Sequence, residues 1–320
     1  AARISLAAEV ADRYVSYRAC EAVLLTLDAE LASRQQSSRG IALAARAGWL
    51  AATDEQLARA AEAGAASQQE AGRATCARLR KSLVTLTGWP EATVAGKLAA
   101  GKPATLPVPA GFSVDYLPVA LLSQRPDLAS AERELAASHA QAGAARADRF
   151  PRLSLVGSLT RDKSYAGDGP TVISSPWFFG PSLTLPLFNG GALAAREEAA
   201  NARHAQALAH YRQAVRLAVE EAEGALLGLD AARATQIQAK TAAVALSANA
   251  LAAEKQWQAG GMSRLALEES RRAAQGAERQ AIISQRDLVR CWISLYKALG
   301  GGWNEIPPGP GTPLSAGASS

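Results

Sequence analysis

The chain has 320 residues, of which 48% are hydrophobic and only 5% aromatic, and its formal net charge is +5. Much of the hydrophobic share is alanine, which favours closely packed helices and supplies little of the bulk found in a compact enzyme core. The lysines and arginines are scattered rather than clustered, so the sequence predicts no nucleic-acid partner.

The N-terminal stretch AARISLAAEV has helical character and no initiator methionine, and we expect the natural N-terminus to be missing. Residues 1–89 contain no proline, and apolar side chains recur at heptad spacing at Val10, Tyr17, Leu24 and Leu31. This pattern predicts long helices that pack as in a coiled coil. No apolar run approaches the roughly 20 residues of a membrane-spanning helix.

Proline placement divides the remaining chain. Eleven of the fifteen prolines lie between Pro90 and Pro186, and residues 187–306 contain none. Because a proline in a helix interior costs about 3 kcal/mol, long helices are expected in the proline-free regions. The predicted parts are a first helical hairpin, a linker or equatorial segment, a helix, a β-hairpin, a second long helical hairpin and a tail, at residues 1–90, 91–124, 125–151, 152–188, 189–300 and 301–320.

The two helical regions are related by an internal repeat. Gly260 follows Gly48 by 212 positions, and Ser294 follows Ser82 by the same interval. A constant offset over this length predicts two similar helical hairpins. A glycine is expected at the turn of each hairpin because the residue that ends the first helix there needs a positive φ.

Two stretches between the helical regions alternate between leucine and small polar residues. The first stretch is LSLVGSLT, which begins at Leu153. The second is WFFGPSLTLPL, which begins at Trp177. Apolar and polar faces over about ten residues predict a transmembrane β-hairpin. The predicted membrane-facing residues are Leu153, Leu155, Leu159, Leu183, Leu185 and Leu187, and the predicted interfacial aromatic residues are Trp177, Phe178, Phe179 and Phe188.

A hairpin in the antiparallel sheet of a soluble domain is the alternative interpretation of this pattern. Pro181 and Pro186 lie within the second stretch, which is typical of an edge or bulged strand. The rest of the chain offers no partner strands, however, and an isolated hairpin is only marginally stable in water. We therefore expect other chains to complete the sheet.

Residue types that carry catalysis or bind metals are not arranged for either purpose. The cysteines form no CxxC pair and are odd in number, so we expect neither a zinc site nor a disulfide framework. The histidines lack metal-ligand spacing, and motifs such as GxSxG or a phosphate loop are absent. The sequence predicts no enzymatic activity, metal or cofactor. The three cysteines are Cys20, Cys76 and Cys291, and the three histidines are His139, His204 and His210.

Several segments, in chain order, resemble one known family. The segment LLSQRPDLASAERELAASHAQAGAARADRFPRLSLVGS is similar to the middle of TolC-like outer membrane efflux channels. The nearest branch is the lipoproteins that serve resistance-nodulation-division (RND) pumps. The same family is matched by RISLAAEVADRYVSYRA, GPSLTLPLFNGGALAAREEAANARHAQALAHYRQAV and SLYKALGGGW, so the resemblance covers nearly the whole chain.

The resemblance implies a mainly α fold with a transmembrane β-hairpin. In the family, three identical protomers share one outer-membrane β-barrel, and their long coiled-coil helical hairpins form one periplasmic α-barrel. The implied partners are outer-membrane lipid, a periplasmic adaptor (membrane fusion protein) and an inner-membrane RND pump. Family members carry a lipidated cysteine, a helical segment and a first β-hairpin ahead of the region that corresponds to residue 1, so an N-terminally truncated member is expected.

The resemblance also implies two sets of functional residues. In the family, a lumen-facing apolar residue shortly after the second turn glycine is followed four positions later by an acidic residue, and together they form a periplasmic gate. The implied gate residues are Leu265 and Glu269, with Glu268 beside them. The implied adaptor-contact residues at the two helical turns are Gly48, Trp49, Thr53, Asp54, Gly260, Gly261 and Ser263. A plain helix–turn–helix cap is the alternative for these turns.

The implied function is a passive export conduit for small molecules or metal ions across the periplasm and the outer membrane. A periplasmic coiled-coil adaptor or scaffold is the main alternative, since it shares long helical hairpins. Such an adaptor is expected to carry many short soluble strands, whereas this chain has a single amphipathic hairpin. A truncated channel fragment without independent function is the third possibility.

Overall fold

The computed structural model describes residues 2–107, 125–164, 167 and 171–301. The chain divides into two compact units, one formed by Ala1–Arg125 with Ala218–Ser320 and the other by Pro126–Leu217. Ten helices and strands lie within the described residues, and most of the length is helical. Most of the expected linker after residue 107 and the tail after residue 301 lie outside the described residues.

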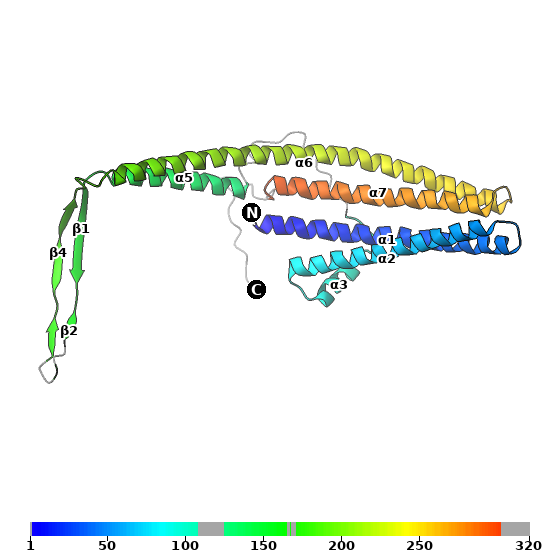
Figure 1. Ribbon diagram of the computed structural model, residues 1–320, viewed down its shortest axis with the longest axis horizontal. Helices are drawn as coiled ribbons and strands as arrows, with labels where there is room; N and C mark the ends of the chain where they lie inside the picture. The colour runs from blue at the N-terminus through cyan, green and yellow to red at the C-terminus, as the bar shows by residue number, and fades with distance from the viewer. Residues whose placement is uncertain (1, 108–124, 165–166, 168–170, 302–320) are drawn as a thin grey trace, which may run out of the picture. The chain divides into compact units, whose positions relative to one another are not determined.

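The first unit is a set of long helices with a small additional one. It contains α1 (Ala2–Arg46), α2 (Ala52–Thr87), α3 (Glu91–Ala100), the later part of α6 (Ala192–Gln258) and α7 (Arg264–Ala298). Figure 1 shows α1 and α2 as a hairpin, with α7 alongside α1. The helices α1 and α2 lie within residues 1–90, and α3 lies within the expected linker.

Small side chains allow these helices to approach closely. Ala222 of α6 is fully buried in a cluster with Leu229 of the same helix and Leu295 of α7. Ala19 and Ala22 of α1 form the centre of a second cluster. Alanine combines high helix propensity with little bulk, so these pairs bury apolar surface along their length rather than around one large core.

Both helical turns use the same backbone device. After α1, Gly48 has φ of 78° and donates its N–H to Ala45, while Trp49 donates to Ala44. After α6, Gly260 has φ of 76° and donates its N–H to Trp257, while Gly261 donates to Gln256. This Schellman pattern requires a left-handed residue that glycine adopts without strain, so the predicted turn glycines are confirmed.

A disulfide bond joins α1 to α2, which contradicts the expectation from the cysteine count. Cys20 and Cys76 are 56 positions apart in sequence, but their Cα atoms are 5.6 Å apart. Antiparallel packing of the two helices brings the residues to the same level, within the range that a disulfide needs. Cys291 on α7 remains a free thiol.

A buried arginine attaches α3 to α1. Arg18 is almost completely buried and donates 2.6 Å from Nη2 to the carbonyl oxygen of Leu98 in the last turn of α3. Its Nη1 pairs with Glu21 at 2.8 Å. A Cβ atom at Gly101 would lie 2.5 Å from Nη2, so glycine leaves the room that the guanidinium occupies. Arg18 thus satisfies a carbonyl at a helix end that lacks an intrahelical partner.

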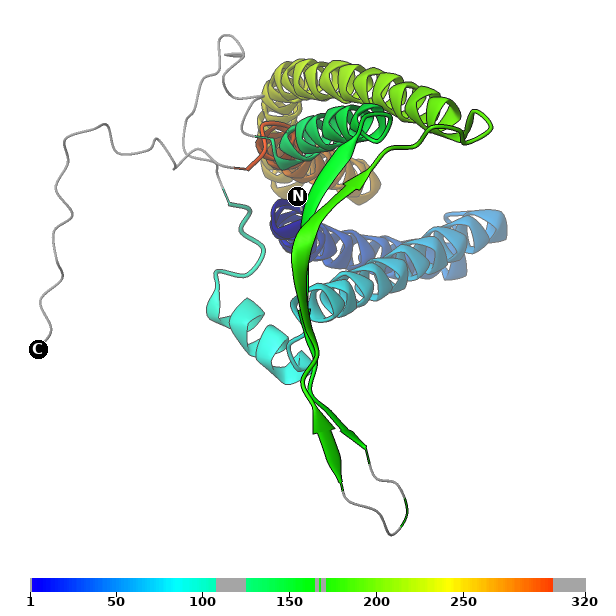
Figure 2. The same cartoon turned by 90° about the vertical axis from the view of Figure 1, so that its left-hand side faces the viewer.

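The second unit contains α5 (Pro126–Ala147), a β-hairpin and the first part of α6. In the hairpin, β1 (Arg152–Leu159) pairs antiparallel with β4 (Trp177–Thr184), and β2 (Asp162–Ser164) pairs with β3 (Val172–Ser174). Figures 1 and 2 show the strands as one narrow ribbon. An ion pair of 2.5 Å between Arg149 and Glu197 ties the two sides of the hairpin base together.

The strand boundaries differ from the predicted ones in two ways. The stretch predicted as a polar loop contains β2 and β3, whose pairing of Asp162 with Ser174 keeps the register of β1 and β4. At its base the ladder ends at the Arg152–Thr184 pair, so Leu185 and Leu187 lie beyond β4. The residue before Arg152 is proline, which has no N–H for a further rung.

Candidate functional site

The paired strands present one face that is entirely apolar. Residues that lie directly opposite each other in an antiparallel ladder share a face. One face therefore carries the four pairs Leu153–Leu183, Leu155–Pro181, Gly157–Phe179 and Leu159–Trp177. Leu153 is 74% exposed and Leu159 is 79% exposed. Leucines bare to this degree in a continuous row are typical of a surface that another molecule or a membrane covers.

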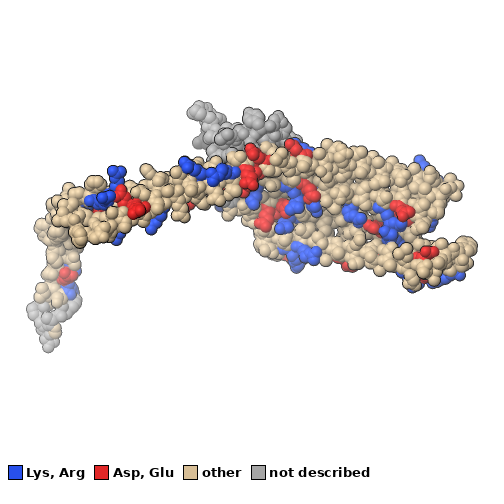
Figure 3. Space-filling model, turned by 45° about the horizontal axis from the view of Figure 1, so that its top comes forward, with Lys and Arg blue, Asp and Glu red and all other residues tan. Residues whose placement is uncertain are grey.

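The opposite face of the same strands carries serine or threonine at four of its eight positions. Its pairs are Arg152–Thr184, Ser154–Ser182, Val156–Gly180 and Ser158–Phe178. Between residues 153 and 160 and between 177 and 184 there is no charged side chain. Figure 3 shows the visible side of the hairpin as largely uncharged, whereas charged side chains are spread over the helices. Alternation of this kind is the pattern of a membrane-spanning barrel strand.

The aromatic residues predicted to lie at a membrane interface take different positions. Trp177 and Phe179 share the apolar face, and Phe178 lies on the polar face. Phe188 follows the end of β4 and is fully open to solvent in the single chain. A Cβ atom at Gly157 would approach Cδ2 of Phe179 to 3.0 Å, so the glycine leaves space for that ring across the ladder.

The turn between α1 and α2, residues 47–54, is here called the first tip. Trp49 is 83% exposed there, and Thr53 is exposed too. The carboxylate of Asp54 accepts a 3.2 Å hydrogen bond from the N–H of Ala51, which caps the start of α2. The turn residues have a structural role of their own, and an exposed tryptophan beside them is a typical recognition residue.

The turn between α6 and α7, residues 259–263, is here called the second tip. Ser263 is the N-cap of α7, and its Oγ accepts a 3.2 Å hydrogen bond from the N–H of Ala266. Gly260 and Gly261 complete the Schellman turn and are exposed. Both tips therefore present short, hydrogen-bonded and solvent-accessible turns at the ends of helix pairs.

The residues of the implied gate lie on two different faces of α7. Leu265 and Glu269 are four positions apart and both exposed, so they form one accessible stripe. Glu268 is completely buried, which corrects its placement beside them. Adjacent helix positions differ by about 100° in direction, so a glutamate pair is divided between the two faces.

Glu268 is held by three partners within the first unit. Its carboxylate accepts hydrogen bonds from Ser33 of α1 at 2.5 Å and from Arg271 at 2.9 Å, and Arg264 lies 3.9 Å away. Arg271 also pairs with Glu254 of α6. A buried carboxylate is tolerated only when it is paired and hydrogen-bonded in this way. The network joins α1, α6 and α7 near the second tip.

A small cavity of about 330 Å³ lies beside this network, between the first tip and the start of α7. Arg34, Asp54 and Arg272 line it together with apolar side chains. Burial, and then the charge of Arg34, lower the pKa of Arg272. Its Nη1 atom and Oγ of Ser37 are buried without hydrogen-bond partners among the described residues. The cavity beside the first tip is therefore lined by polar groups as well as apolar ones.

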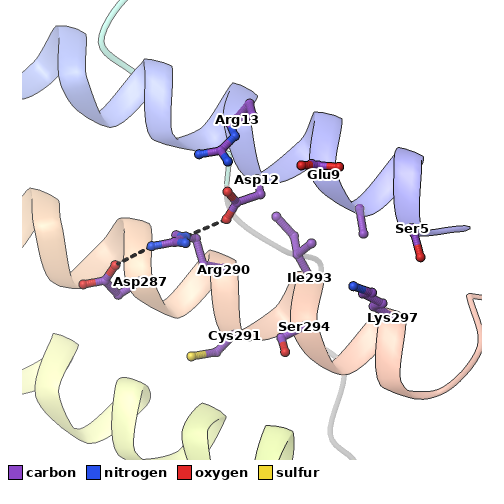
Figure 4. A pocket seen from close by; sticks show the side chains of 11 residues that line it. Ser5, Glu9, Asp12, Arg13, Asp287, Arg290, Cys291, Ile293, Ser294 and Lys297 are labelled. Atoms are coloured by element: carbon purple, nitrogen blue, oxygen red, sulfur yellow. Dashed lines mark hydrogen bonds and ion pairs between the residues drawn. The ribbon is translucent and has the colours of Figure 1, made fainter. Parts of the chain in front are cut away.

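A second cavity, of about 610 Å³, lies between α1 and α7 and is drawn in Figure 4. Arg290 extends from α7 between two carboxylates, with 2.5 Å to Asp12 of α1 and 3.9 Å to Asp287. Burial, and to a lesser extent Asp287, raise the pKa of the nearby Cys291 thiol. The charge of Arg290 is compensated by the two carboxylates. We therefore interpret these ion pairs as a structural link between α1 and α7.

Within the residues that the structure describes, no three histidine, cysteine or acidic side chains gather closely enough to hold a metal ion. Among the helices described, none has the length and apolar character that crossing a membrane requires.

Some relationships were not predicted from the sequence. The disulfide and the burial of Glu268 depend on how neighbouring helices align along their axes. His139 of α5 and His204 of α6, 65 positions apart, have ring centroids 5.2 Å from each other. The heptad pattern signals that helices pair, but not which levels along two helices meet.

Comparison with known proteins agrees with this geometry. The family model "Outer membrane efflux protein" matches residues 117–301. The chain is 32% identical over 312 residues to the solvent efflux pump outer membrane protein SrpC of Pseudomonas putida, covering 94% of this chain and 63% of that protein. It is 33% identical over 309 residues to the outer membrane protein OprJ of Pseudomonas aeruginosa, with 95% and 63% covered.

Solved structures of outer-membrane channels are also similar to this chain. The outer-membrane channel OprN superimposes with a TM-score of 0.78 at 30% identity, covering 94% of this chain and 67% of that one. The Campylobacter jejuni CmeC outer membrane channel has the same fold, with a TM-score of 0.78 at 21% identity and 94% and 63% covered. The chain belongs to the outer membrane efflux protein family. It spans about 63% of the length of the curated relatives above.

Proposed function

We propose that the chain is part of the outer-membrane channel of a tripartite efflux system, a passive conduit for small molecules or metal ions. Family membership supports a channel over an adaptor or scaffold. The relatives are named for the efflux of solvents, toluene and antibiotics, which supports export but leaves the cargo of this chain open. The proposed location is the outer membrane, with the helices extending into the periplasm.

The observation that carries this proposal is the two-faced hairpin. Its leucine face is exposed, its other face carries four serine or threonine side chains, and its outer strand edges pair with no other described strand. Lipid offers no hydrogen bonds to open edges, so strands that face lipid require a closed barrel. We infer that three identical protomers supply the neighbouring strands of one barrel and that the leucines face hydrocarbon.

The proposed gate is the stripe of Leu265 and Glu269 on α7. In a homotrimer, three copies of Glu269 around one axis would place three carboxylates at the same level, which attracts cations and narrows the pore. The exposure of both side chains in the single chain supports this position. Glu268, which is buried against Ser33, has no place in the proposed ring.

The proposed partners of the two tips are a periplasmic adaptor and, through it, an inner-membrane RND pump. The exposed Trp49 and the glycine turns at Gly48 and Gly260 support this role, because they offer accessible backbone next to a large amphipathic side chain. The adaptor would engage the turns rather than the helix sides. No cofactor or enzymatic step is part of this proposal.

Conductance across planar lipid bilayers tests the proposal. The protein should insert and form cation-selective pores, and Glu269→Gln should reduce the selectivity for K⁺ over Cl⁻. Glu278→Gln is the matched control, because Glu278 is exposed and nine positions further along α7, about half a turn away in direction. A protein that stays in solution without detergent and forms no pore would fit a scaffold or a fragment and contradict the proposal.

A further inference from the structure

Two of the three histidines of the chain meet between α5 and α6. The rings of His139 and His204 have centroids 5.2 Å apart and planes inclined at 57°. Both belong to the second unit, and Figure 1 shows the two helices side by side there. His139 is exposed and His204 is half-buried, so solvent has access to the pair. The third histidine, His210, is exposed on α6.

Ser138 fixes the proton on one of these rings. Its hydroxyl donates to the carbonyl oxygen of Leu135 at 2.7 Å, and its oxygen lies 3.2 Å from Nδ1 of His204. A hydroxyl has a single proton to donate, so Nδ1 of His204 must be the donor in the second bond. The neutral ring then carries its lone pair on Nε2, the arrangement found where a partner orients a metal-bound histidine.

The spacing of the two rings matches a shared tetrahedral ion. With each ligand nitrogen about 2.0–2.1 Å from the ion, two imidazole centroids at a tetrahedral angle are about 5 Å apart. The observed separation is 5.2 Å. Aromatic rings in contact are commonly about 4.5–7 Å apart, so the distance is compatible with a shared ion, and the oriented nitrogen of His204 is the observation that favours one.

We propose that His139 and His204 form a binding site for a divalent transition-metal ion of the Zn²⁺ class. Imidazole nitrogen is a preferred ligand of Zn²⁺, Cu²⁺ and Ni²⁺, and a tetrahedral arrangement favours Zn²⁺ among them. No further cysteine, histidine or carboxylate joins the two rings to make a group of three among the described residues. Water therefore fills the other positions, and the ion is held by two side chains that bridge α5 and α6.

Zn²⁺ titration of the purified protein by isothermal calorimetry tests the site. We expect one Zn²⁺ per chain, with affinity reduced tenfold or more in both His139→Gln and His204→Gln. His210→Gln is the matched control and should bind as the unchanged protein does. Cys291→Ser, which removes the only free thiol of the structure, should also leave the binding unchanged. Circular dichroism of each variant checks that the helices are retained.

The role of Ser138 is tested separately, as a positioning residue. Ser138→Ala should weaken Zn²⁺ binding about tenfold, because partners of metal-bound histidines contribute on that order. Ser138→Thr keeps a hydroxyl and should restore most of the affinity, whereas a purely structural role predicts equal binding in both variants. Equal Zn²⁺ affinity in His204→Gln and the unchanged protein, or loss of binding in His210→Gln, would overturn the proposal.

Discussion

Ser33 donates a 2.5 Å hydrogen bond from Oγ to the fully buried carboxylate of Glu268, which links α1 to α7. Arg271 provides the second strong bond to the same carboxylate. Removing the carboxylate leaves the buried hydroxyl of Ser33 without its partner and takes away one of the two carboxylates that pair with Arg271, which is more costly than losing an exposed pair.

Glu268→Ala should lower the free energy of unfolding by about 2–3 kcal/mol, because it leaves the buried hydroxyl of Ser33 unpaired and removes the ion pair of a buried carboxylate with Arg271. Urea denaturation followed by circular dichroism measures this. Glu269→Ala is the control, since an exposed helix residue is expected to change stability by about 0.5 kcal/mol or less. Equal effects of the two substitutions would show that the burial of Glu268 is wrong.

Gly157→Ala should impair folding of the hairpin, because the new methyl group would lie 3.0 Å from the ring of Phe179. At Gly180 the same substitution would place the methyl group 3.7 Å from Phe178, an ordinary contact, so Gly180→Ala serves as control. The yield of folded, protease-resistant protein in detergent measures the effect. Combining Gly157→Ala with Phe179→Ala should restore the yield, and a yield that stays low would rule out this contact as the cause.

Reduction of the disulfide should destabilise the α1–α2 hairpin. Cys20 and Cys76 close a loop of 56 positions, and a loop of that length stabilises the folded state by about 4 kcal/mol in the chain-entropy model. Adding dithiothreitol, or replacing both cysteines with serine, should lower the unfolding midpoint in urea. The double variant should then be insensitive to dithiothreitol. A protein whose midpoint does not respond to reduction would contradict the bond.

Cys291 should react slowly with iodoacetamide, because burial raises the pKa of its thiol and only the thiolate is nucleophilic. The reaction should accelerate with pH over a higher range than that of free cysteine. Since the raised pKa favours the protonated folded form, its contribution to stability is present below the unfolded thiol pKa and is lost as pH rises through the folded pKa. Mass spectrometry should find one alkylated cysteine per chain. Labelling as fast as free cysteine at pH 8 would refute this.

The local parts of this fold were predictable from the sequence. Gly48 and Gly260 mark the helical turns because a left-handed residue is needed at one defined position. The alternating leucines predicted the strands, since side chains on a strand point to opposite faces. The exact end of β4 was not predictable from alternation alone, because it depends on the rung lost at Pro151.

Relationships between helices were not predictable in the same way. The pairing of Cys20 with Cys76 and of His139 with His204 depends on the axial alignment of two helices, which a heptad pattern does not specify. Glu268 and Glu269 are chemically identical neighbours, and only packing against α1 decides which one is buried. Long-range contacts of this kind, rather than the type of each element, are what the structure adds.

In the proposed channel, the leucine face of β1 and β4 contacts hydrocarbon. Spin labels at Leu155→Cys and Ser154→Cys, in a Cys291→Ser background and in liposomes, test it through the accessibility of each label to oxygen and to a water-soluble nickel chelate. The label at residue 155 should be relaxed mainly by oxygen, which concentrates in lipid, and the label at residue 154 mainly by the nickel chelate. Equal exposure of both labels to the nickel chelate would contradict the claim.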